Sequence, residues 1–131
     1  MLGTVVDQNV EAHVDDTIVL TIPTGPAFRS VASLVLGGVG TRLDLPFERV
    51  GDLQLAVLSM LDASTGDEAS VEIRADGTRV AVSVGPLRPG VESDDGLALV
   101  LGRLTDGLDA GKRDHASWLT VYMGRARASR E

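Results

Sequence analysis

The pattern that most constrains this fold is a change of hydrophobic period within one stretch, residues 47–84. Up to about residue 64, apolar side chains recur every three or four positions, as on one face of a helix. Residues 69–75 and 78–84 instead alternate apolar and polar side chains, and Asp76-Gly77 between them is a strong hairpin signal. A helix followed by a hairpin predicts a layered domain that mixes both kinds of element. The side chains expected on the buried face of this helix are Phe47, Val50, Leu53, Ala56, Val57, Met60 and Leu61.

Two further elements are predicted before this stretch. Residues 17–22 are rich in β-branched side chains and end at Pro23, which indicates a strand. Residues 24–44 carry apolar side chains at helical spacing, and Pro26 suits the first turn of a helix, where its missing N–H costs nothing. The stripe expected to be buried comprises Phe28, Val31, Ala32, Val35 and Val39, widened by Leu34 and Leu36.

The elements after the hairpin are predicted mainly from turn and cap residues. Asp94 or Asp95 can cap a helix that begins near Gly96, because a carboxylate accepts hydrogen bonds from the free N–H groups at a helix start. The complete order predicts an α+β fold, a two-layer sandwich of a mixed, mostly antiparallel sheet packed against about three helices. The segments concerned are a loop over residues 85–95, the capped helix, a turn over residues 107–114 and a strand over residues 117–123.

Length and composition fit one domain and exclude several chemistries. The 131 residues carry a formal net charge of -7, which disfavours binding to nucleic acid or to an anionic membrane. Without cysteines, the chain has no disulfides, thiolate catalysis or cysteine-based zinc site. No apolar stretch reaches the roughly 18 residues that span a bilayer and no secretory signal is visible, so we expect a cytoplasmic protein. We divide the chain into an acidic leader or edge strand (residues 1–16), one domain (17–124) and a basic tail (125–131).

Three segments, in their order and spacing, carry a resemblance to a known fold. They are TIVLTIPTGPAFRSVASLVLGGVGTRLDLP from residue 17, DLQLAVLSMLDAS at residues 52–64 and DDGLALVLGRLTDGLD at residues 94–109. Over residues 17–123 the chain resembles the histidine-kinase-like ATPase fold of sensor histidine kinases, and most closely the serine kinases that act as anti-sigma factors. The resemblance implies a nucleotide cleft between the second helix and the glycine-bearing start of the third.

At the positions that match this family's nucleotide site, most of the functional residues are replaced. Ser59 stands where the family has an acidic general base, and Ala63 where an asparagine holds magnesium. A serine without a partner base is not basic at pH 7, and a methyl group cannot coordinate a hard cation. Val84 replaces the aspartate that binds adenine. Gly96 is kept from the phosphate-binding glycines, but the second one is replaced by Ala98.

These replacements predict a non-catalytic regulatory domain that binds a protein, with no cofactor and no metal. The resemblance implies partner switching with a sigma factor or an anti-sigma antagonist, and a homodimer. One alternative is an active ATP-dependent serine kinase in which Asp62, Asp67 or Glu68 replaces the missing acid and metal ligand. Another alternative is a small-ligand sensor that uses the emptied cleft, which Val84 would make more apolar.

The remaining polar and aromatic residues give weaker indications. His13 and His115 have no metal-ligand spacing and are interpreted as surface residues. Trp118 and Tyr122 share one face of the last strand, opposite its aliphatic side chains. Exposed aromatics on a sheet favour an interface with another protein. The alternative, which the sequence leaves open, is that Trp118 covers a sheet edge or packs on a tail.

Overall fold

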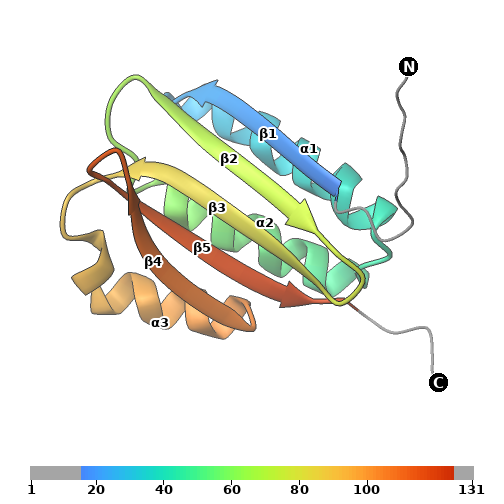
Figure 1. The fold of residues 1–131 in the computed structure, drawn as a ribbon. Helices are drawn as coiled ribbons and strands as arrows, with labels where there is room; N and C mark the ends of the chain where they lie inside the picture. Colours follow the sequence, from blue (N-terminus) through green and yellow to red (C-terminus); the bar gives the residue numbers. More distant parts are fainter. Residues whose placement is uncertain (1–15, 126–131) are drawn as a thin grey trace, which may run out of the picture.

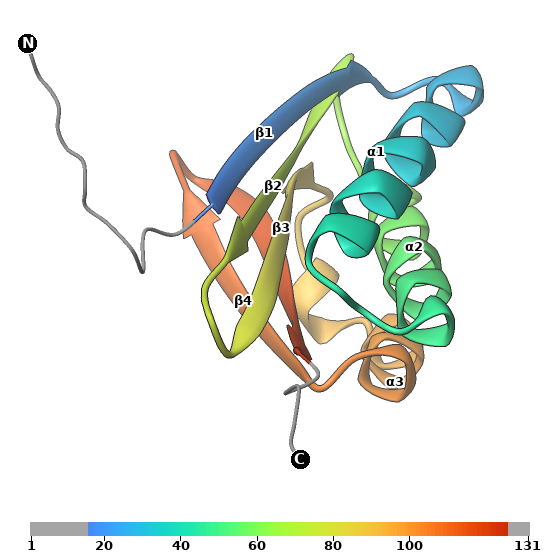
Figure 2. The same ribbon diagram turned by 90° about the vertical axis from the view of Figure 1, so that its right-hand side faces the viewer.

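The computed structural model describes residues 16–125, which form an α+β two-layer sandwich. One layer is a five-stranded sheet and the other consists of three helices that lie side by side on one face of it (Figures 1 and 2). The predicted leader, apart from Asp16, and the predicted tail, apart from Arg125, lie outside the described residues, as does His13. In chain order the elements are β1 (Asp16–Pro23), α1 (Arg29–Arg42), α2 (Phe47–Leu61), β2 (Glu68–Ala75), β3 (Arg79–Leu87), α3 (Asp95–Leu104), β4 (Gly107–Arg113) and β5 (Ala116–Gly124).

The sheet has the order β1-β2-β3-β5-β4, and every pairing between its neighbouring strands is antiparallel. The prediction of a mixed sheet is therefore wrong for residues 16–125. The reason lies in the last hairpin. A single helix, α3, connects β3 to β4, so these two strands run in the same direction, but β5 inserts between them and pairs antiparallel with both. The two helices between β1 and β2 likewise return the chain for an antiparallel pairing.

The core lies between the two layers and is almost entirely aliphatic. Val80, Val82 and Val84 of β3 and Val57 and Met60 of α2 are fully buried. The predicted helical stripes are only partly buried. Of the stripe predicted in residues 24–44, Ala32 and Leu36 are buried, whereas Phe28, Val31 and Leu34 are exposed. No helix among the described residues is long and apolar enough to cross a membrane.

One segment that was predicted to be a turn is a strand in the structure. Residues 107–114 were expected to form a turn, but Gly107–Arg113 is the edge strand β4. Its sequence, GLDAGKR, has no apolar alternation because most of its side chains are exposed. It is a strand because it pairs with β5 along its whole length, from Gly107 opposite Tyr122 to Arg113 opposite Ala116. The turn is reduced to Asp114 and His115, both with positive φ angles.

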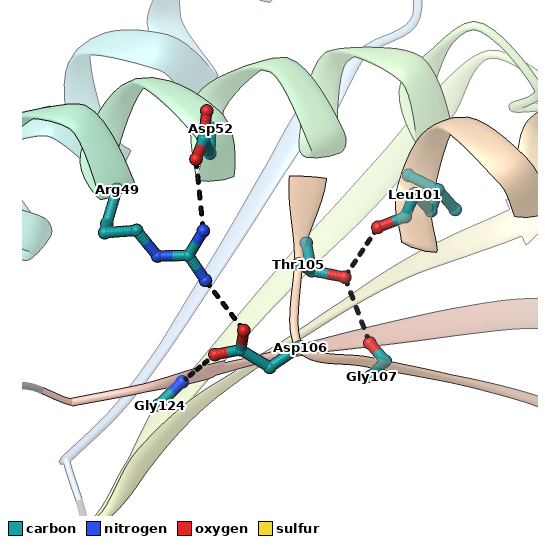
Figure 3. Close-up of polar contacts among 7 residues, drawn as sticks. All are labelled: Arg49, Asp52, Leu101, Thr105, Asp106, Gly107 and Gly124. Carbon is teal, nitrogen blue, oxygen red and sulfur yellow. Dashed lines mark hydrogen bonds and ion pairs between the residues drawn. The ribbon is translucent and has the colours of Figure 1, made fainter. Parts of the chain in front are cut away.

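Polar contacts join the end of α3 to its neighbours (Figure 3). Arg49 near the start of α2 donates to Asp52 at 3.1 Å and to Asp106, in the α3–β4 connection, at 2.9 Å. The second carboxylate oxygen of Asp106 accepts the Gly124 N–H at 2.7 Å. One aspartate thus links α2, the end of α3 and the end of β5, because its two oxygens accept from different elements.

The residue before Asp106 completes this junction. Thr105 is buried, and its hydroxyl contacts the Leu101 carbonyl at 2.7 Å and the Gly107 carbonyl at 3.2 Å (Figure 3). The Leu101 carbonyl also accepts the Thr105 N–H at 3.0 Å, so the backbone and side chain of one residue close the last turn of α3 at the point where the chain turns into β4.

Helices α1 and α2 approach closely near their connection. A Cβ added to Gly40 would lie 2.6 Å from Cγ2 of Val50, so only glycine fits at this crossing. Further along, the Gln54 side-chain amide donates to the Ser33 carbonyl at 2.7 Å. These two contacts fix the relative position of α1 and α2.

Candidate functional site

Three of the five predicted site positions meet in one open pocket between the end of α2 and the start of α3. Ser59 and Ala63 line it from α2 and the turn after it, and Gly96 lines it from the first turn of α3. Its volume is about 290 Å³. The other lining residues are Asp62, Arg88, Asp94, Leu97 and Val100. The residue matched to the phosphate function therefore shares one place in the fold with those matched to the base and metal functions, which are four positions apart at the end of α2.

Ser59 and Ala63, the two predicted site residues on the α2 side of the pocket, have within residues 16–125 only backbone groups as hydrogen-bond partners. Ser59 donates its hydroxyl proton to the Leu55 carbonyl one turn earlier, at 2.9 Å. Among the described residues it has no histidine or carboxylate as hydrogen-bond partner. Ala63 is buried, and its carbonyl accepts the Arg88 N–H at 2.8 Å, which ties the end of α2 to the end of β3. Neither side chain provides a base or a cation ligand.

All three charged side chains that line the pocket are engaged in ion pairs. Asp62 pairs with Arg29 at the start of α1. Arg88 pairs with one carboxylate oxygen of Asp94. The other oxygen of Asp94 accepts the Leu97 N–H at 3.0 Å, which confirms Asp94 as the N-cap of α3. Asp94 therefore serves as a helix cap and not as an unpaired ligand in the pocket.

The other two predicted positions lie elsewhere. Val84 is fully buried in the middle of β3, opposite Leu119 and Val71, and does not line the pocket. Its side chain belongs to the core beneath the helices, so it does not make the pocket more apolar. Ala98 is exposed on α3 and is also absent from the pocket lining. The hypothesis of a small-ligand sensor depended on Val84 lining the cleft, and the position of Val84 does not support it.

The carboxylates invoked for an active kinase are also separated. Asp62 lines the pocket, whereas Asp67 and Glu68 lie at the start of β2, exposed and outside the lining. Among residues 16–125, no group of three or more histidine, aspartate or glutamate side chains is arranged to hold a metal ion. His115 lies exposed in the β4–β5 turn.

The aromatic residues of β5 are covered by their neighbours on the outer face of the sheet. The Trp118 ring lies directly on Gly85, where an added Cβ would overlap it, and the Arg113 guanidinium lies 4.1 Å from the ring centroid. Arg113 also donates to both carboxylate oxygens of Glu72, at 3.0 and 3.1 Å. Trp118 thus packs on Gly85 of the inner strand β3 rather than over a sheet edge, and these contacts make its ring less available for an interface.

The charged partners on this face also shift the titration of two groups. The hydrogen bond from Arg113, opposed by partial burial, holds the pKa of Glu72 below its ordinary value. Tyr122 donates its hydroxyl proton to Asp109 at 2.9 Å, and this bond raises the pKa of the phenol. Arg79 lies 4.2 Å from the centroid of the same ring. Both shifts come from contacts among strands rather than from a ligand site.

The exposed apolar side chains of the helix layer were not predicted from the sequence. Phe47 was predicted to be buried, but it is 93% exposed at the first residue of α2. A helical period identifies one face of a helix, but not whether the helix end reaches past the sheet. The other exposed large apolar residues on the three helices are Val31, Leu34, Leu55, Leu99 and Val100.

No protein-family model matches this chain, and no curated protein matches it.

Proposed function

We propose that this chain is a degenerate domain of the histidine-kinase-like ATPase fold, of the anti-sigma-factor type, that acts in the cytoplasm by binding a protein and without catalysis. The observation that carries the proposal is the α2–α3 pocket. Positions matched independently to base, cation and phosphate functions converge there, and its carboxylates are held in ion pairs. The element order, with two helices before a hairpin and a third after it, also supports the fold assignment.

The chemistry of the pocket argues against phosphoryl transfer. A general base needs a pKa near the working pH and reach to the substrate hydroxyl. The Ser59 hydroxyl has no such basicity and is bonded to a helix carbonyl. Phosphoryl transfer also depends on cations that neutralise the phosphates. The Ala63 methyl group cannot hold one, so ATP would lack the cation ligand that the family uses.

Protein binding is supported by the apolar side chains around the pocket. Val100 lines it and is 44% exposed, and Leu99 is 60% exposed beside it on α3. Leu55 lies one turn before Ser59 on α2 and is 55% exposed. Exposed apolar side chains gathered on neighbouring helices mark a docking surface. The partner we propose is a sigma factor or an anti-sigma antagonist.

The nucleotide part of the proposal is tested by thermal unfolding of the protein with magnesium and ATP. A ligand at 100 times its Kd stabilises by about 2.7 kcal/mol, which raises the melting temperature by several degrees. We expect no shift for the wild type at millimolar ATP. The matched variant is Ser59→Glu with Ala63→Asn, which places an acidic residue and an asparagine where the resembled family has them. A shift of several degrees in the wild type would contradict the proposal.

The protein-binding part is tested with purified sigma factors and antagonist domains. We expect one of them to bind, and Val100→Asp to weaken that binding at least tenfold. Val19→Asp is the matched control, because Val19 is 59% exposed on the opposite face of the sandwich. Absence of binding by every partner, or equal weakening by both variants, would contradict the proposal.

An active kinase is the second candidate, favoured by the position of Asp62 in the pocket lining. Asp62 would have to leave Arg29 to act as a base. Incubation with labelled ATP and an antagonist domain separates the two functions. Phosphate transfer that Asp62→Ala abolishes would establish the kinase and overturn the non-catalytic function.

A further inference from the structure

A second hollow lies on the helix layer, on the other side of α2 from the pocket. This groove between α1 and α2 has a volume of about 660 Å³, roughly twice that of the pocket. Gly37 and Thr41 line it from α1, and Phe47 and Gly51 line it from α2. Figure 2 shows the sheet on the left and the helices on the right, with α1 and α2 adjacent in the helix layer.

The groove is a stable feature of the helix pair. The crossing at Gly40 and Val50 and the bond from Gln54 to the Ser33 carbonyl hold the two helices in place. A Cβ added to Gly51 would meet nothing within 4 Å. The space above Gly51 is thus not filled by any side chain of the described residues.

Phe47 projects at the rim of this groove. It is 93% exposed, the highest value among the exposed large apolar residues. Aromatic side chains beside a hollow are the commonest anchors of protein interfaces, because they bury a large area at low cost in side-chain entropy. The ring is therefore available to pack against an apolar side chain that enters the groove.

Charge at the rim indicates the kind of partner. Asp44 and Glu48 line the groove, and neither forms an ion pair within residues 16–125. A second copy of this chain would bring four carboxylates together across a two-fold axis, and the chain is already acidic. A basic partner would instead neutralise them.

We propose that the α1–α2 groove is a second docking site, which binds a basic amphipathic helix of a partner protein. A bulky apolar side chain of that helix enters between α1 and α2 against Phe47. A lysine or arginine within one turn of it faces Asp44 and Glu48. Helix-in-groove recognition of this kind uses apolar anchors at helical spacing. The site is separate from the α2–α3 pocket and extends the proposed function to a partner that touches both sides of α2.

Selection of random displayed peptides against the full chain tests this inference without a known partner. We expect the selected peptides to share a bulky apolar residue with lysine or arginine three or four positions away. Their affinity, measured by fluorescence anisotropy, should fall at least tenfold between 50 mM and 500 mM salt, because salt shortens the Debye length and screens the attraction between exposed charges.

Matched variants assign the binding to the groove. Phe47→Ala removes the anchor. Gly51→Leu fills the space above Gly51, and because leucine favours a helix more than glycine does, this variant should not lose binding by unfolding. Each should weaken the peptides at least tenfold, as should Glu48→Lys. The controls are Leu34→Ala and Gly38→Leu, exposed positions on α1 outside the groove lining. They should change the affinity less than twofold.

Several results would overturn the inference. The selection could enrich no peptides, it could enrich peptides without basic residues, or the peptides could bind Phe47→Ala as tightly as the wild type. A dimer in sedimentation equilibrium that Phe47→Ala dissociates would assign the groove to a second copy instead. Val100→Asp separates this inference from the proposed function. Partner binding that depends on Val100 but not on Phe47 would refute the groove and leave the proposed function standing.

Discussion

The aromatic side chains on the two outer surfaces of this sandwich differ in how far their neighbours cover them. On the outer face of the sheet, Trp118 lies between Gly85 and Arg113, and Tyr122 lies beneath Arg79 and bonds to Asp109. On the helix layer, Phe47, Leu34 and Leu99 are 93%, 78% and 60% exposed, without comparable cover. Aromatic character alone does not mark an interface, because the cover supplied by neighbouring strands decides whether a side chain is available to a partner.

This contrast assigns a role in stability to the sheet face and, under the proposed function, a role in binding to the helix face. Substitutions at the sheet face should change stability and leave binding unaffected, whereas substitutions at the helix face should do the reverse.

The largest effect is expected for Gly85→Ala. The added methyl group overlaps the Trp118 ring, which cannot move without losing its contact with Arg113, so we expect a loss of about 1–3 kcal/mol in urea denaturation. The control is Gly111→Ala, because Gly111 pairs with Trp118 from the other side and an added Cβ there meets nothing within 4 Å. In a Trp118→Leu background the cost of Gly85→Ala should shrink. Equal costs in both backgrounds would refute the packing explanation.

Arg113→Ala should have the next largest effect. It removes two hydrogen bonds to Glu72 and the cover of Trp118, but Arg113 is 43% exposed, so screening limits the loss to about 1 kcal/mol. Lys112→Ala, at the adjacent exposed position of β4, is the control. The fluorescence of Trp118, the only tryptophan, should shift toward that of a solvated indole in Arg113→Ala alone.

The Glu72–Arg113 pair also predicts a pH dependence of stability. Because the pKa of Glu72 is lower in the folded state than its ordinary value of 4.5, its contribution is fully present above that pH. It is lost as the pH falls through the folded-state pKa. The stability difference between the wild type and Glu72→Gln should therefore shrink between pH 5 and pH 3. A difference that stays constant over this range would contradict the assignment.

Tyr122→Phe should cost about 0.5 kcal/mol, because it removes a hydrogen bond at a partly exposed site. The bond to Asp109 raises the pKa of this phenol, so the only tyrosine should titrate above its ordinary value of 10 in ultraviolet absorbance. Asp109→Ala should lower the pKa of the phenol toward that value. Titration unchanged by Asp109→Ala would show that the bond is absent in solution.

The smallest effect on stability is expected for Phe47→Ala. The side chain is 93% exposed, so its removal should leave the free energy of unfolding within about 0.5 kcal/mol of the wild type. Leu34→Ala, at 78% exposure, should behave in the same way. A loss above about 1 kcal/mol for Phe47→Ala would mean that the ring is packed, and the helix face would then lose its strongest anchor.

Local patterns predicted most of the elements. The periods of α2, β2 and β3 and the Asp76-Gly77 turn are all visible in sequence, and Asp94 was identified as one of two candidate caps. The strand β4 was not predicted, because an exposed edge strand needs no apolar alternation and is held by its partner. Of the candidate site, Ser59, Ala63 and Gly96 do meet, whereas Val84 lies in the core and Ala98 on the exposed side of α3, both outside the pocket lining.

The sequence by itself determined most of the helices and strands, since their periods depend on neighbours within a few residues, but it did not determine β4. It also determined that the core is aliphatic and that no cysteine chemistry occurs. Only the tertiary structure decided that β5 enters between β3 and β4 and that Trp118 is covered while Phe47 is exposed. Those outcomes depend on contacts between residues far apart in the chain, which no local period records.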